Sequence, residues 1–168
     1  YEETRYEAYG PAGVAVLVDV LTDNKNRTVS EIRHIFTKNN GAMAEAGAVG
    51  WNFDRKGLIT VAKSGLTDDQ IFEKAIEAGA DDVDTEGDMY ELKTADSDLH
   101  AVVNALEQMG IKVEEAKLTM LPKTTVKVEG ANVGAILRLM ESLEDNDDVQ
   151  DFYANFDISD EDMAAAMN

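Results

Sequence analysis

The order of strand-like and helix-like segments in the middle of the chain limits the fold more than any other feature. A β-prone run at 58–63 is followed by a helix that starts at Thr67 and ends at Gly79. The helix is predicted to bury a stripe made of Ile71, Phe72, Ala75 and Ile76. The remaining segments are a hairpin at 82–93, a helix at 99–109 and a strand at 111–118. This β-α-β-β-α-β order, over about 57–120, is the ferredoxin-like order.

Each flank of this middle region supplies a strand, a helix and a strand. Before it lie an apolar strand at 14–21, a helix after the capping pair Thr28 and Glu31, and a strand at 49–53. After it lie a strand at 124–128, a helix at 132–143 and a strand at 149–158. Neither half has a core large enough to be stable alone.

We therefore predict an α+β protein in which one ferredoxin-like domain is inserted in the middle connection of another. The first domain comprises residues 1–56 and 121–168, and the inserted domain comprises residues 57–120. The alternative is a sequential arrangement of two or three domains. A short helix with Met163 and Met167 on one side is predicted at the end, for packing on the first domain or on a partner.

The charge of the chain is strongly negative and unevenly placed. The formal net charge is -19, with eight acidic and eight basic residues in 1–65 and 26 acidic against seven basic in 66–168. A polyanion would therefore be repelled by most of the surface, and least by the first third of the chain. The chain has no cysteine, no apolar stretch of the roughly 20 residues that span a bilayer, and no signal-peptide pattern at 1–9. We expect a cytoplasmic protein without a membrane partner.

Basic side chains gather around the polar segment that follows the first apolar strand. A connection from a strand to a helix N-terminus favours anions, because free backbone N–H groups and the helix dipole lie there. The other interpretation is a turn and a helix cap with ordinary solvated charges. The candidate nucleic-acid-binding residues are Lys25, Arg27, Arg33, His34, Lys38, Arg55 and Lys56.

Other motifs indicate structure more than chemistry. The run 9–13, YGPAG, precedes a strand, whereas phosphate loops follow one, so we interpret it as a tight turn. The segment 82–87 imitates a calcium loop, but Lys93 stands where a glutamate is needed. No metal site, cofactor site or catalytic constellation is predicted. The aromatic residues at 51, 53, 152, 153 and 156 are interpreted as strand residues, mostly in the core, with base stacking as the alternative.

Four motifs resemble the YebC/PmpR family, which includes a mitochondrial translational activator of cytochrome oxidase subunit I. They are YGPAGVAVLVDVLTDNKNRT, EIRHIFTKNNG, FDRKGLI and VQDFYANFDI. The family usually has glycine where this chain has Ala12, and more often has arginine at Lys25. Family members usually begin with a basic helical domain that this chain lacks, so the resemblance covers two of three domains.

The resemblance implies a non-enzymatic regulator of gene expression, and first a DNA-binding transcriptional regulator. A ribosome-associated translation factor, linked to proline-rich nascent chains, is the alternative. A ligand-binding regulatory module is the third hypothesis. With a net charge of -19, we expect DNA or ribosome binding to need the basic N-terminal domain.

Overall fold

The computed structural model describes residues 1–167 and divides into two compact units. One unit contains Tyr1–Phe53 together with the chain from Pro122 onward, and the other contains Asp54–Leu121. The chain therefore leaves the first unit after Phe53 and returns to it at Pro122. Each unit has a hydrophobic core of its own.

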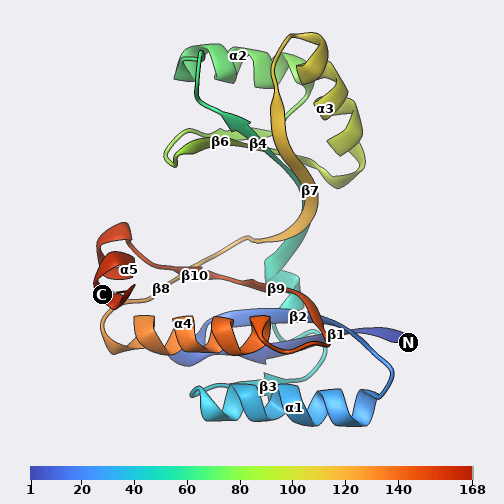
Figure 1. Ribbon diagram of the computed structural model, residues 1–168, viewed down its shortest axis with the longest axis vertical. Helices are drawn as coiled ribbons and strands as arrows, with labels where there is room; N and C mark the ends of the chain where they lie inside the picture. The colour runs from blue at the N-terminus through green and yellow to red at the C-terminus, as the bar shows by residue number, and fades with distance from the viewer. Residues whose placement is uncertain (168) are drawn as a thin grey trace. The chain divides into compact units, whose positions relative to one another are not determined.

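The continuous unit has the predicted ferredoxin-like architecture. Its sheet has the strand order β5-β6-β4-β7, and α2 and α3 pack against each other (Figure 1). The pairs β4–β6 and β5–β6 are antiparallel. The elements are β4 (Phe53–Ala62), α2 (Asp68–Ala78), β5 (Asp82–Asp84), β6 (Met89–Ala95), α3 (Leu99–Gln108) and β7 (Val113–Pro122).

Local signals place α2 where the sequence predicts it. Thr67 accepts a hydrogen bond from the backbone N–H of Gln70, and the Gln70 side chain accepts one from the Thr67 N–H. This capping box satisfies two backbone donors that the helix leaves open. Gly79 ends the helix at φ 102°, a left-handed conformation that glycine adopts without strain.

The predicted apolar stripe of α2 is wrong in one respect. Ile71 and Ala75 are fully buried, but Phe72 is 44% exposed and Ile76 is 67% exposed. The core of this unit is filled by neighbours such as Tyr90 and Leu106, so only one narrow side of α2 is needed to cover the sheet.

The discontinuous unit also has a four-stranded antiparallel sheet, in the order β3-β1-β2-β9. A separate parallel pair joins β8 to β10. The elements of this unit are β1 (Glu2–Tyr9), β2 (Ala15–Thr22), α1 (Lys25–Lys38), β3 (Ala42–Ala44), β8 (Val126–Lys127), α4 (Ala131–Glu144), β9 (Val149–Ala154), β10 (Phe156–Asp157) and α5 (Asp160–Met167).

The strands of this unit differ from the predicted ones in four places. Strand β1 was not predicted, although Thr4, Tyr6 and Ala8 alternate with charged residues along it. Residues 50–52 form a 3₁₀ turn, not a strand, and residues 126–127 pair with β10, outside the main sheet. The predicted strand at 149–158 breaks at Asn155, whose side chain accepts a hydrogen bond from the Ala15 N–H and donates one to the Thr124 carbonyl.

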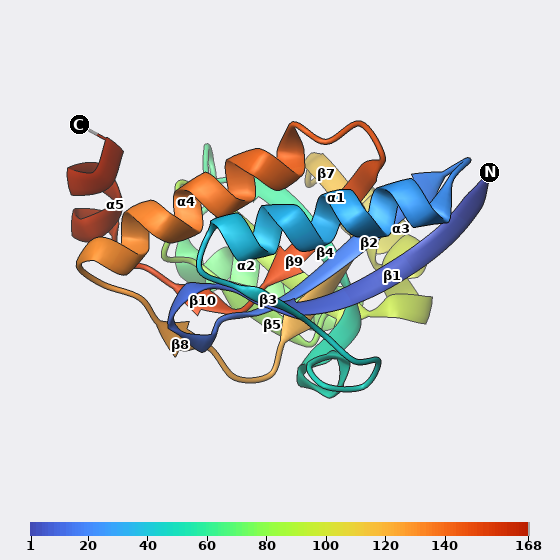
Figure 2. The same ribbon diagram turned by 90° about the horizontal axis from the view of Figure 1, so that it is seen from below.

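Helices α1 and α4 pack on one face of this sheet and lie side by side in Figure 2. Both helices present apolar stripes to the inward side chains of β2, and α5 contacts α4. The fully buried residues of the interface are Val14, Val16, Val18, Ile32, Phe36, Ile136, Leu139 and Leu143.

The turn between β1 and β2 is tight, as the YGPAG motif predicts. The Gly10 N–H donates to the Val14 carbonyl, and the Val14 N–H donates to the Pro11 carbonyl. Ala12 has φ 63°, in the left-handed region, where an alanine is strained and a glycine is not.

Candidate nucleic-acid interface

The polar segment after β2 forms a helix cap and a buried hydrogen-bond cluster. Asn24 is the N-cap of α1, and its side chain accepts from the Arg27 N–H at 3.1 Å. Thr28 is fully buried, and its hydroxyl oxygen lies 2.7 Å from Thr22 Oγ1 and 2.7 Å from Asp148 Oδ2. The predicted cap at Thr28 is therefore wrong, because its hydroxyl bonds to distant residues while α1 begins three residues earlier.

Arg27 and Lys25, in the first turn of α1, both have acidic partners. Arg27 Nη2 lies 2.8 Å from Asp148 Oδ2, and further carboxylates lie at 3.4 Å on Asp23 and 3.7 Å on Glu31. Lys25 Nζ lies 3.8 Å from Glu2. The hydrogen bonds from Arg27 and Thr28 hold the pKa of Asp148 below its usual value. A carboxylate of the chain itself thus lies where the sequence suggests an incoming phosphate.

Arg33, His34 and Lys38 lie on α1 with exposed side chains. Within residues 1–167, none of the three forms an ion pair or a side-chain hydrogen bond. Lys38 is in the last turn, where a cation is stabilised by the helix dipole. This outer face of α1 carries positive charge that is not balanced locally.

Arg55 and Lys56 belong to the other unit, on β4. Arg55 Nε lies 3.7 Å from Asp96, and Lys56 Nζ lies 2.9 Å from Asp81. The hydrogen bond to Asp81 raises the pKa of Lys56. Four of the seven candidate residues are therefore paired with carboxylates, and three have no such partner within residues 1–167.

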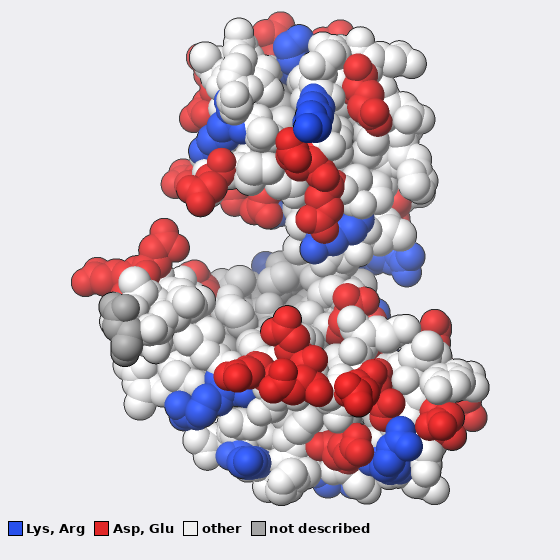
Figure 3. All heavy atoms as spheres, in the orientation of Figure 1, with Lys and Arg blue, Asp and Glu red and all other residues white. Residues whose placement is uncertain are grey.

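The visible surface of both units carries many acidic side chains (Figure 3). Basic side chains appear singly or in small groups between them. No broad basic surface is present on this face, which agrees with the net charge of -19.

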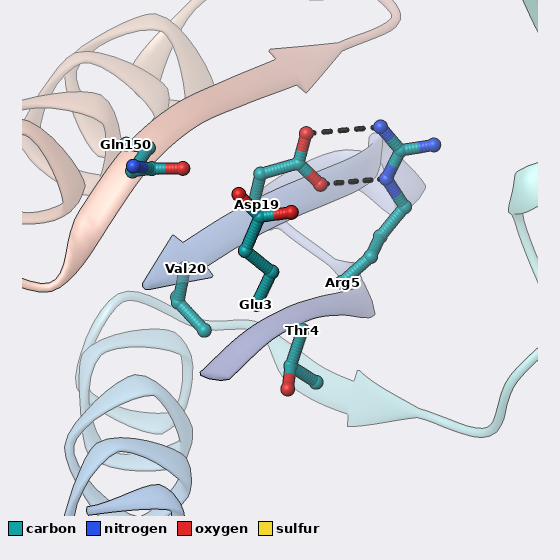
Figure 4. A pocket seen from close by; sticks show the side chains of 6 residues that line it. All are labelled: Glu3, Thr4, Arg5, Asp19, Val20 and Gln150. Carbon is teal, nitrogen blue, oxygen red and sulfur yellow. Dashed lines mark hydrogen bonds and ion pairs between the residues drawn. The ribbon is translucent and has the colours of Figure 1, made fainter. Parts of the chain in front are cut away.

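An ion pair that the sequence did not predict joins β1 to β2. Arg5 Nε and Nη2 donate to the two carboxylate oxygens of Asp19 at 2.6 and 2.9 Å (Figure 4). The two residues stand directly opposite each other in the strand register. Asp19 is the one charge in an apolar run, and the bidentate pair explains how the sheet accommodates it. The pair could not be predicted because β1 was not predicted. Without that strand, nothing places Arg5 opposite Asp19.

A cavity of about 260 Å³ lies beside this pair. Its lining includes Thr4 and Gln150 as well as the charged pair (Figure 4). The hydrogen bond and the charge of Asp19 raise the pKa of Arg5. Two N–H donors of the guanidinium are used by that carboxylate.

The calcium-like segment is a hairpin, with Asp84 Oδ1 accepting from the Glu86 N–H at 2.9 Å. Within residues 1–167, no group of three or more His, Cys, Asp and Glu side chains is arranged to hold a metal ion. No helix in that part of the chain is both long and apolar enough to cross a membrane.

Comparison with known proteins places the chain in a family. Residues 1–156 match the family profile described as "TACO1/YebC second and third domain". A relative from a Geobacter species is 58% identical over 167 residues, which is 99% of this chain and 67% of the relative. A relative from Geobacter sulfurreducens is 54% identical over the same shares. Both are named probable transcriptional regulatory proteins.

A solved structure has the same fold. The crystal structure of a conserved hypothetical protein from Aquifex aeolicus matches with a TM-score of 0.83 and 41% identity, over 95% of this chain and 66% of that one. The chain thus spans about two thirds of the length of these proteins. With a profile match over 156 residues and relatives above 50% identity, the chain belongs to the TACO1/YebC family, whose bacterial members are named probable transcriptional regulatory proteins.

Proposed function

We propose that this chain is the part of a YebC-type regulator that contacts DNA through the outer face of α1, acting by binding and not by catalysis. The names of the relatives support a role in transcription. Since the chain spans about two thirds of those relatives, the activity of the whole protein is part of the proposal. The place of action is the cytoplasm, where bacterial DNA lies.

The observation that carries this proposal is the contrast between paired and unpaired cations. Arg33 and Lys38 have no acidic partner in residues 1–167, whereas Arg27 is bound by Asp148. A lysine or arginine that replaces condensed counterions on DNA raises the affinity of the protein for DNA. Each such contact makes the slope of log K against log salt more negative by about 0.9. A cation already bound to a carboxylate must first lose that partner.

The negative remainder of the chain restricts how DNA approaches. With a net charge of -19, only a limited surface can approach a phosphate backbone without repulsion. We therefore propose weak binding by this chain and stronger binding by a form that also carries a basic N-terminal domain.

The test compares Arg33→Glu/Lys38→Glu with the control Lys74→Glu/Lys112→Glu, which makes the same charge change on the other unit. Binding to a labelled duplex is measured by fluorescence anisotropy at two salt concentrations. The α1 variant should bind about tenfold more weakly, with a salt slope smaller by about 2. The control should change the affinity much less. Equal losses in both variants would indicate general repulsion and would exclude α1 as the contact surface.

The ribosome-associated alternative has one observation in its favour. A chain with a net charge of -19 is attracted to basic proteins, which a ribosome presents beside its RNA. Pelleting with ribosomes, together with no measurable DNA binding by either form, would replace the transcriptional proposal with this one.

A further inference from the structure

Trp51 is the single tryptophan of the chain, and it is exposed on a turn. The sequence predicts that Trp51 is a strand residue, one of a set that lies mostly in the core. In the structure the residue is 64% exposed. Its indole N–H donates to the Ala48 carbonyl at 3.0 Å. The ring is therefore held by a hydrogen bond while much of its surface faces solvent.

The turn that carries Trp51 is fixed by a set of hydrogen bonds on one side. The Glu7 carboxylate accepts from the backbone N–H groups of Gly47, Val49 and Gly50 at 2.6, 2.9 and 2.5 Å. Burial raises the pKa of Glu7, but the three donors outweigh it and hold that pKa below the usual value. The Glu7 carboxylate therefore stabilises the turn through its bonds to three backbone N–H groups.

The other side of the turn is fixed by Asn52, which is only 4% exposed. Its side-chain oxygen accepts from the Thr124 backbone N–H at 3.0 Å, and its side-chain amide donates to the Thr124 carbonyl at 3.1 Å. The backbone carbonyl of Asn52 accepts from the Lys123 N–H at 2.7 Å. Lys123 therefore lies next to the Trp51 turn and is itself exposed.

The two segments that Asn52 joins carry no acidic side chain of their own. Residues 46–53 contain no charged side chain, and residues 122–128 contain two lysines and no acid. Acidic residues also lie close by, since Glu7 bonds to the turn and Glu45 and Asp54 flank it in the sequence. Tyrosine and tryptophan rings that are fixed and exposed are the side chains on which unpaired bases stack, whatever the base.

We propose that Trp51 stacks against an unpaired nucleobase. The inference deepens the proposed function and rests on it. The ligand is a single-stranded segment of nucleic acid, since a duplex keeps its bases stacked on each other and presents no free base face. The stack would add contact area that the acidic chain cannot obtain from charge.

The test uses the fluorescence of the intact chain, in which Trp51 is the only tryptophan. The probes are a 12-nucleotide oligo(dT), a 12-nucleotide oligo(U) and a 12-base-pair duplex, at about 50 mM salt. Both single strands should quench the emission as they saturate the protein, and the duplex should not. A difference between the two single strands would identify the sugar that the site prefers.

Variants separate stacking from a structural role of the ring. With labelled oligonucleotides, Trp51→Ala should bind single strands about tenfold more weakly, the loss expected for one base–aromatic stack. Trp51→Phe loses the bond to Ala48 but keeps a ring, so most of the affinity should return. Binding of the duplex should be equal in all three proteins.

The outcomes distinguish this inference from the proposed function. If single strands bind with unchanged emission and Trp51→Ala binds as well as the parent, stacking is wrong while the α1 proposal stands. If no nucleic acid binds, both proposals fail. Quenching by an apolar peptide but by no oligonucleotide would overturn the inference and identify the turn as a protein contact.

Discussion

Asp148 and Thr28 are 120 residues apart in the chain, yet Thr28 Oγ1 donates to Asp148 Oδ2 over 2.7 Å. The bond joins the first turn of α1 to the connection between α4 and β9. Arg27 adds a second bond to the same oxygen at 2.8 Å. This cluster links the N-terminal end of α1 to the segment that follows the C-terminal end of α4.

Replacing Asp148 with alanine should therefore destabilise the protein. The change removes the bonds from Thr28 and Arg27 and leaves a buried hydroxyl with fewer partners, which costs about 1–2 kcal/mol of unfolding free energy. The neighbour Asp147 provides the control, and Asp147→Ala should cost less than about 0.5 kcal/mol. Urea denaturation followed by circular dichroism measures both. Equal effects would show that the cluster adds nothing beyond surface charge.

The stabilisation by Asp148 should depend on pH in a defined direction. Its pKa is lower in the folded chain than in the unfolded one, so its contribution is present above about pH 4 and is lost as the pH falls through the folded value. Protonation also relieves repulsion in a chain of net charge -19, so the parent protein alone is not informative. The stability difference between the parent and Asp148→Asn should be largest near pH 7 and should shrink below pH 4. A difference that is constant from pH 7 to pH 3 would contradict this assignment.

Ala12→Gly should stabilise the protein. Ala12 has φ 63°, and relief of the left-handed strain is worth about 1 kcal/mol. Gly13 is the matched reverse case, since it has φ 77° and open space for the methyl group that an alanine would add. Gly13→Ala should cost about 1 kcal/mol by conformation alone. Thermal melts of both variants check the pair, and the same sign of shift in both would refute the explanation.

Two isoleucines of α2 should respond very differently to the same truncation. Ile71 is fully buried, so Ile71→Ala should cost about 2–4 kcal/mol, whereas Ile76 is 67% exposed and Ile76→Ala should cost less than about 1 kcal/mol. Both positions are in one helix, so the change in helix propensity is the same. Denaturant midpoints provide the measurement, and comparable losses would mean that Ile76 is covered in solution.

The parts of the fold that follow from local sequence could be predicted. The capping box at Thr67 and the glycine at 79 act on neighbouring residues only. The first and last residues of α2 can therefore be predicted from the local sequence. The alternation along β6 likewise depends on no distant residue. The whole β-α-β-β-α-β order of the continuous unit was therefore predictable.

The parts that failed depend on partners far away in the chain. Thr28 has the sequence of a cap, but Asp148 and Thr22 draw it into the interior. The pairing of Arg5 with Asp19 requires the register of a strand that was not predicted. The turn at Trp51 is fixed by Glu7, more than 40 residues earlier, and no local pattern indicates it.

The contacts of the seven candidate residues could not be predicted from the sequence either. Whether an exposed lysine or arginine has a carboxylate beside it is a question of tertiary structure, as Lys56 and Asp81 show. Spacing alone identified the outer face of α1 but could not separate Arg33 from Arg27.

The insertion of one unit into the other has a consequence for synthesis of the chain. All residues of the continuous unit have been made once Leu121 has left the ribosome, so its core can form at that point. Strand β2, in the middle of the other sheet, must wait for β9, because Val16, Leu17 and Val18 pair with residues 152–154. Until then one edge of β2 is an unpaired strand edge of the kind that promotes aggregation. The sheet whose first strands are made earliest is thus the last to be completed. We expect chaperones to bind the chain mainly during that interval.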